Sequence, residues 1–190
     1  MRIQDLFVKS NEHLGRVVDQ IGSEQWSLAL PEKASWNPQN LTRAVAYHAF
    51  DDAWVPDSLA GRTEAEVGDR YTSVLDTPEP RSVYRQYNLR AREAVAAFTT
   101  LDTVTHLSYG EFSAREYLQH ITSFRTIRTF DIAHLIGVDP QFDTEFLEGV
   151  ESEYSPLMGQ YREMGVFPDP IPVDAGATLE TRVMAMFGRD

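Results

Sequence analysis

The chain lacks cysteine and long apolar segments. Without cysteine, the 190-residue protein can form no disulfide bond and offers neither a thiolate metal ligand nor a cysteine nucleophile. No apolar run approaches the ~20 residues that a membrane-spanning helix needs. The first residues, Met1–Asp5, carry no apolar signal segment. These absences predict a cytoplasmic protein with no membrane partner.

Basic charge is also scarce. The chain has 17 basic residues, of which only Lys9 and Lys33 are lysines, against 29 acidic residues, so the formal net charge is −12. Because phosphate repels an acidic protein, we expect no nucleic acid and no anionic membrane as the main partner. A hydrophobic content of 42% suits a folded core, and the length suits one domain over residues 1–190.

Apolar residues recur at helical spacing along most of the chain, which predicts an all-α protein. The alternating, glycine-containing segment at residues 103–112 predicts a small hairpin between the third and fourth helices. The simplest architecture is a bundle of four long helices with an extra C-terminal helix. The capping signals predict a first helix at about Ile3–Ile21, a second from the Asn37-Pro38 start to Ala60, a third from Pro80 to Phe98, a fourth from Ser113 to Ile136 and a fifth from Asp143 to Glu163. A short helical piece is expected at 179–187.

The second helix carries the most informative pattern. One face has the apolar residues Leu41 and Val45 at one end and Val55 and Leu59 at the other, with His48 and Asp52 one turn apart in the middle. A polar pair inside an inward-facing apolar stripe destabilises the fold unless it finds partners. A metal ion, a buried counter-ion or a ligand could each supply them.

The fourth helix has a matching face with a single charge. Arg128 lies in a stripe that is otherwise apolar, and a buried arginine needs an acidic partner. In an antiparallel arrangement Arg128 could pair with Asp52; the alternative is that its side chain extends to the surface. The aromatic residues near this region could line an apolar pocket, although such residues more often form core: Tyr47, Phe50, Trp54 and Tyr109.

Three segments resemble a known family: His48–Gly68, Tyr117–Gly137 and the tail from Val166 to Asp190. The first is similar to the second-helix signature of DinB-like proteins. The branch that it resembles is the mycothiol-dependent maleylpyruvate isomerase N-terminal domain, which binds metal, with its uncharacterised actinobacterial relatives. The resemblance covers nearly the whole chain.

The resemblance implies a four-helix bundle that holds a divalent metal by three side chains. His48 matches the ligand from the second helix, and Phe124 and Arg128 fall where the family has two ligands one turn apart on the fourth helix. Phenylalanine has no lone pair and guanidinium is a cation, so neither can bind a metal. We therefore expect no cofactor. The alternative is zinc or nickel on His48, with Asp52 and His120 as further candidates.

Three functions remain open. The first is a metal-free relative that binds a small molecule or a low-molecular-weight thiol in the old active-site cleft, at His48, Asp52, Phe124 and Arg128. The second is an active metal- and mycothiol-dependent isomerase or transferase in which the metal polarises a thiol or carbonyl. The third is a non-catalytic interaction protein that forms a homodimer and has no small-molecule site. No glycine-rich phosphate loop or nucleophile elbow identifies a catalytic residue.

Overall fold

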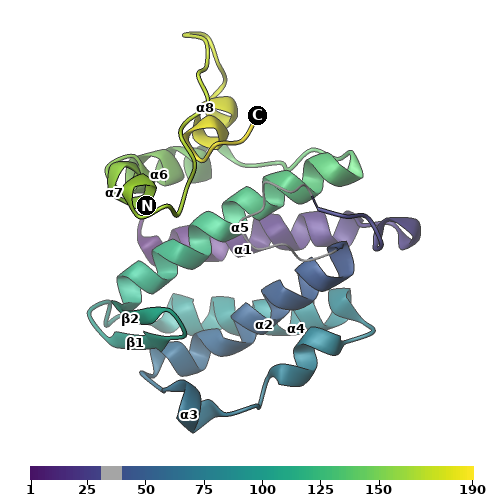
Figure 1. The fold of residues 1–190 in the computed structure, drawn as a ribbon, viewed down its shortest axis with the longest axis vertical. Helices are drawn as coiled ribbons and strands as arrows, with labels where there is room; N and C mark the ends of the chain where they lie inside the picture. Colours follow the sequence, from purple (N-terminus) through teal and green to yellow (C-terminus); the bar gives the residue numbers. More distant parts are fainter. Residues whose placement is uncertain (31–39) are drawn as a thin grey trace.

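The computed structural model describes residues 1–30 and 40–190, and this part of the chain is largely helical (Figure 1). The all-α prediction is confirmed, and so is the small antiparallel hairpin. The long helices are α1 (Ile3–Gln20), α2 (Leu41–Leu59), α4 (Pro80–Ala97) and α5 (Ala114–Ile136). The shorter elements are η1 (Ser23–Gln25), α3 (Glu64–Val67), η2 (Thr72–Asp76), β1 (Val104–Leu107), β2 (Gly110–Ser113), α6 (Thr144–Tyr154), α7 (Met158–Glu163) and α8 (Leu179–Met186).

Among the long helices, α2 packs against α4, α4 packs against α1, and α1 packs against α5. Helices α2 and α5 contact each other little. Helices α6, α7 and α8 gather at the side of α5 that faces away from α2 and α4 (Figure 1). The hairpin lies at the N-terminal end of α5, against α2. We call the side of the four long helices between α2 and α5, where neighbouring helices contact each other least, the α2–α5 flank.

The buried apolar residues form two clusters rather than one continuous core. The N-terminal halves of α1 and α5 and the C-terminal halves of α2 and α4 meet in the first cluster, which α6, α7 and α8 extend. The opposite halves of the same four helices meet in the second cluster. Helices α2 and α4 therefore run in the same direction, and residues 60–79 must return along α2 before α4 can begin.

The ends of the helices follow from local chemistry. The side chain of Asn40 accepts a hydrogen bond from the Arg43 amide at 2.9 Å and begins α2. The expected start at Asn37-Pro38 lies outside the described residues. Capping boxes that begin at Thr63 and Ser113 open α3 and α5, as their sequences predict. Gly137, with a φ of 76°, ends α5 in the left-handed conformation that glycine favours.

One expected helix needs correction. The segment 143–163 was expected to be one helix, but it forms α6 and α7. Pro156 lies between them; it has no amide hydrogen to donate and its ring clashes with the preceding turn, so the helix breaks there. Pro56 lies inside α2, which nevertheless continues to Leu59, close to the expected end at Ala60. No helix in the described parts of the chain is both long and apolar enough to cross a membrane.

Candidate functional site

A layer of buried polar side chains separates the two apolar clusters. Each long helix contributes to it near its middle: Asn11 from α1, His48 and Asp52 from α2, Asn88 from α4 and Arg125 from α5. All five side chains are buried, and Asp52 and His48 are fully so. A buried polar group is tolerated only when it is hydrogen-bonded, so the contacts inside this polar layer decide whether it stabilises the fold.

Arg125 is the centre of the polar layer. Its Nη2 atom donates to Asp52 Oδ1 at 2.9 Å and to the His48 carbonyl oxygen at 3.2 Å. Its Nη1 atom contacts His48 Nδ1, and its Nε atom donates to Asn11 Oδ1 at 3.3 Å. One guanidinium therefore joins α5 to both α2 and α1, across the flank where α2 and α5 otherwise contact each other little.

Asn88 connects α4 to the same layer. Its side-chain amide lies 2.9 Å from Asn11 Oδ1 and 3.3 Å from Asp52 Oδ2, and it also donates to the Tyr84 hydroxyl at 2.9 Å. Both carboxylate oxygens of Asp52 are thus occupied, one by Arg125 and one by Asn88. The layer is an interlocked network in which removal of one member leaves buried polar atoms without partners.

The protonation states follow from these contacts. Burial, with the charges of Arg125 and Arg128, lowers the pKa of His48 far below its ordinary value, so this ring is neutral. Because His48 Nδ1 faces the Arg125 donor, we assign the ring proton to Nε2. Burial opposes the charge on Arg125, but the carboxylates of Asp52 and Asp51 outweigh it and raise its pKa. Arg125 therefore stays a cation, balanced by Asp52.

The predicted pairing of Asp52 with Arg128 is wrong in register, because the cation bonded to Asp52 is Arg125. Arg128 is buried as well, with its Nη1 atom 3.7 Å from Asp131 Oδ2, so it does not extend to the surface. The error arose because α5 is buried around most of its circumference. Its most deeply buried positions include Leu118, Thr122, Arg125, Thr129 and Ile132.

The four predicted pocket residues are therefore only partly brought together. His48 and Asp52 lie in the polar layer, and the charge of Arg128 is near enough to lower the pKa of His48. Phe124 is half-buried and projects about one hundred degrees around the helix from Arg125. Two surface pockets, one beside Trp54 and one beside Arg43, are lined by none of these four side chains.

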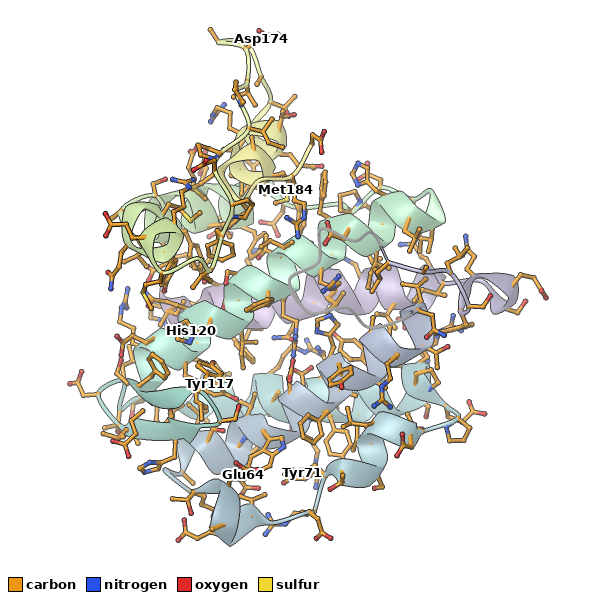
Figure 2. All side chains as sticks on the ribbon, viewed as in Figure 1. Glu64, Tyr71, Tyr117, His120, Asp174 and Met184 are labelled. Carbon is orange, nitrogen blue, oxygen red and sulfur yellow. The ribbon has the colours of Figure 1, made fainter. Side chains whose placement is uncertain are left out.

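The proposed metal ligands do not assemble either. Within residues 1–30 and 40–190, no group of three or more His, Asp or Glu side chains is placed to hold a metal ion. His120 lies instead toward the hairpin, with its ring against Phe112 and its Nδ1 atom 3.3 Å from the Tyr109 hydroxyl (Figure 2). The set His48, Asp52 and His120 is thus not a site in this fold.

Asp51 is the point where the polar layer reaches the surface. Its Oδ2 atom lies 3.5 Å from Arg125 Nη1, and its side chain is 40% exposed, whereas neighbouring Asp52 is completely buried. Partial burial of its carboxyl group, helped by the charge of Asp52, raises the pKa of Asp51 to about 6, and the charge of Arg125 only partly opposes this shift. Asp51 can therefore gain or lose a proton close to neutral pH.

The raised pKa of Asp51 predicts a pH-dependent stability. Since the pKa is about 6 in the folded chain and ~3.9 in an unfolded one, the folded state holds the extra proton between these values. The stability due to Asp51 is then fully present below about pH 4 and is lost as the pH rises through 6. The advantage of Asp51→Asn over the unchanged protein should grow over this range in urea unfolding. A pH-independent difference would contradict the assignment.

Sequence reasoning missed three members of the polar layer, Asn11, Asn88 and Arg125. The signal for Asn88 was present, because Tyr84, Asn88, Ala91 and Val95 have the three- and four-residue spacing of one helix face. Asn88 interrupts that face as His48 and Asp52 interrupt the face of α2. A search for polar residues at the centres of apolar stripes would have found it.

Comparisons with protein-family models, with curated proteins and with solved structures find no match to this chain. The polar layer and the flank beside it are therefore interpreted from their own chemistry.

Proposed function

We propose that the chain is a DinB-like four-helix bundle, akin to the maleylpyruvate isomerase N-terminal domain, in which an arginine has replaced the catalytic metal. In this view it binds a small organic molecule on the α2–α5 flank. The observation that carries the proposal is the Arg125 guanidinium, which contacts His48 Nδ1 and lies 2.9 Å from Asp52 Oδ1. A positive charge thus stands beside the histidine that the family resemblance assigns to a metal.

The electrostatics favour this replacement. A divalent metal needs lone pairs, and in this layer the His48 Nδ1 lone pair and the Asp52 Oδ1 atom already face Arg125. A second cation at the same place would be repelled by a guanidinium that cannot lose its proton. The metal-dependent isomerase is consequently the weaker alternative, and no observation in the described residues favours a purely structural dimer.

The α2–α5 flank is the side from which a ligand could reach the polar layer. Helices α2 and α5 contact each other little there, Asp51 is partly exposed, and Phe124 is half-buried. A bound molecule would meet an apolar ring from Phe124 and a carboxyl group from Asp51 that can hold a proton near neutral pH. Arg125 would position Asp51 rather than contact the ligand, because its side chain is only 1% exposed.

Low-molecular-weight thiols are the ligand class to test first. We expect mycothiol, glutathione or their S-methyl derivatives to raise the melting temperature, since a ligand at 100 times its Kd adds ~2.7 kcal/mol of stability. Asp51→Ala and Phe124→Ala should each remove most of the shift. Asp102→Ala, a change at an exposed acid elsewhere, should leave it intact. No shift with any of these thiols, or an equal shift in the Asp51 and Phe124 variants, would contradict the assignment of this flank.

A further inference from the structure

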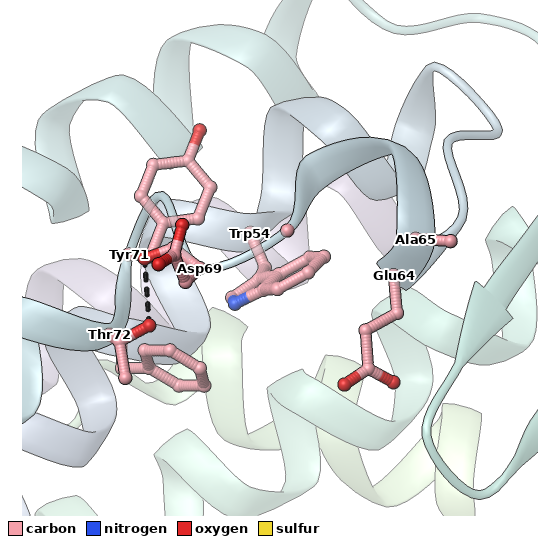
Figure 3. Close-up of a pocket in the computed structure, with 8 residues that line it drawn as sticks. Trp54, Glu64, Ala65, Asp69, Tyr71 and Thr72 are labelled. Carbon is pink, nitrogen blue, oxygen red and sulfur yellow. Dashed lines mark hydrogen bonds between the residues drawn. The ribbon is translucent and has the colours of Figure 1, made fainter.

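A hollow lies on the opposite side of α2 from the polar layer. Residues 60–79, which connect the parallel helices α2 and α4, carry α3 and η2 back along α2. Between them lies an open pocket with a volume of about 690 Å³ (Figure 3). Phe50 and Trp54 on α2 line it, and each is two residues, or about 200°, around the helix from His48 or Asp52. Of the aromatic residues predicted to line a pocket, these two do so.

We infer that this pocket binds a small organic cation, an amine or a quaternary ammonium group. The inference is independent of the function proposed for the α2–α5 flank. Recognition of such cations relies on aromatic faces together with nearby negative charge. The pocket is large enough for a metabolite-sized ligand.

Aromatic rings make up one part of this recognition. The Trp54 ring packs against the rings of Phe50 and Tyr71, with ring centroids 6.2 Å and 5.8 Å away and planes inclined at 66° and 68°. The Nε1 atom of Trp54 is buried, so the part of the indole that is open to the pocket is carbon. An indole face is the best aromatic surface for a cation. The Tyr71 hydroxyl donates to Asp57 Oδ2 at 2.7 Å, which holds the Tyr71 ring in place.

Negative charge makes up the other part. Glu64 and Asp69 line the pocket, and in the view of Figure 3 they lie on either side of Trp54. Within the described residues, neither carboxylate takes part in an ion pair. Both are exposed, and the chain as a whole has a net charge of −12, so an approaching cation is attracted and an anion repelled.

Two basic residues of the connection that carries Glu64 and Asp69 are already engaged. Arg62 Nη1 lies 3.2 Å from Asp57 Oδ1, and Arg70 Nη1 lies 2.9 Å from Asp57 Oδ2. The Arg70 guanidinium also sits over the Tyr71 ring, 5.7 Å from its centroid, so this ring already attracts a cation. Both arginine side chains thus pair with Asp57, and the carboxylates of Glu64 and Asp69 can balance the positive charge of a ligand.

Choline and its neutral isostere, in which a tert-butyl group replaces the trimethylammonium group, test the inference on the full chain. At constant ionic strength, choline should bind saturably in the millimolar range and shift the NMR signal of the Trp54 indole N–H. The chain has three tryptophans, and the signal that disappears in Trp54→Phe is that of Trp54. The isostere should bind about tenfold more weakly, because it fills the same volume without the charge.

Variants locate the site. Trp54→Leu should abolish binding, and Glu64→Gln with Asp69→Asn should weaken it several-fold. The matched control, Asp102→Asn with Glu148→Gln, removes two exposed acids elsewhere and should change the affinity little. Four results would each overturn the inference: no saturation by choline, equal affinity for the isostere, unchanged binding in Trp54→Leu, or an equal loss in the control. A melting curve of Trp54→Leu verifies that the variant is folded, and Trp54→Phe, with weaker binding expected, serves if it is not.

Discussion

Replacing Arg125 with methionine is expected to lower the free energy of unfolding by about 3–5 kcal/mol, the loss typical when one partner of a buried ion pair is removed. The reason is that the Asp52 carboxylate, which is completely buried, would lose the cation 2.9 Å away. Asp52→Leu should cost a similar amount, because Arg125 is only 1% exposed and would keep its charge. Urea unfolding of each variant measures these losses.

The double variant distinguishes coupling from two independent losses. With both charges gone, we expect Asp52→Leu with Arg125→Met to be more stable than either single variant, since no lone charge stays buried. The exposed pair Arg85–Asp19, with 2.7 Å between Nε and Oδ1, provides a control whose disruption should cost less than ~1 kcal/mol. Additive losses in the Arg125–Asp52 cycle would mean that the two side chains do not act as a pair.

Arg125→His is expected to turn the polar layer into a metal site. The variant would place an imidazole beside His48 and Asp52 as a third metal ligand. It would also remove the cation that now contacts both side chains. Histidine is shorter than arginine, and an ion held by Zn–N bonds of ~2.0–2.1 Å would fill the difference. The purified variant should hold about one zinc per chain and melt higher with zinc than with a chelator, by linkage.

Two further variants test why the site would form. Arg125→Gln removes the cation without adding a strong ligand, so it should gain no tightly bound metal. Phe124→Glu with Arg128→His adds ligands at the positions that the family resemblance identifies but keeps Arg125. We expect no metal there either, because the guanidinium remains in contact with His48 and repels a dication. Zinc binding by this last variant would show that Arg125 is not the element that replaces the metal.

Local signals in the sequence predicted the elements well. Capping boxes at Thr63 and Ser113, the glycine at 137 and the alternation before Ser113 each depend on neighbours a few residues away, and the structure has these features where the sequence places them. The failure at Pro156 came from relying on the signals at the two ends of the segment and overlooking a residue inside it that cannot donate a backbone hydrogen bond.

Only two of the five members of the polar layer, His48 and Asp52, were predicted from the sequence. The face of α2 placed His48 and Asp52 inside, because its apolar neighbours have one clear side. Helix α5 has no such single side: it is covered by α1, by the C-terminal helices and by the hairpin, so nearly every position from 117 to 133 is buried. With Arg125 and Arg128 both inside, periodicity had no means to decide which of them meets Asp52.

The pocket beside Trp54 shows a second limit. Phe50 and Trp54 stand out in the sequence, but Glu64, Asp69 and Tyr71 belong to the connection between α2 and α4. Their meeting with Trp54 depends on those helices running in the same direction, which forces the connection back along α2. Helix direction is a property of the whole packing arrangement, and no motif within residues 60–79 encodes it.

Metal content measured by elemental analysis of the unchanged protein, purified without chelator from cells supplied with zinc and nickel, tests the central claim most directly. If Arg125 provides the positive charge at His48 and Asp52, the protein should contain far less than one metal per chain, and chelator should not change its melting temperature. One zinc or nickel per chain that survives dialysis against chelator, and that Arg125→Met leaves in place, would contradict the replacement of the metal by arginine.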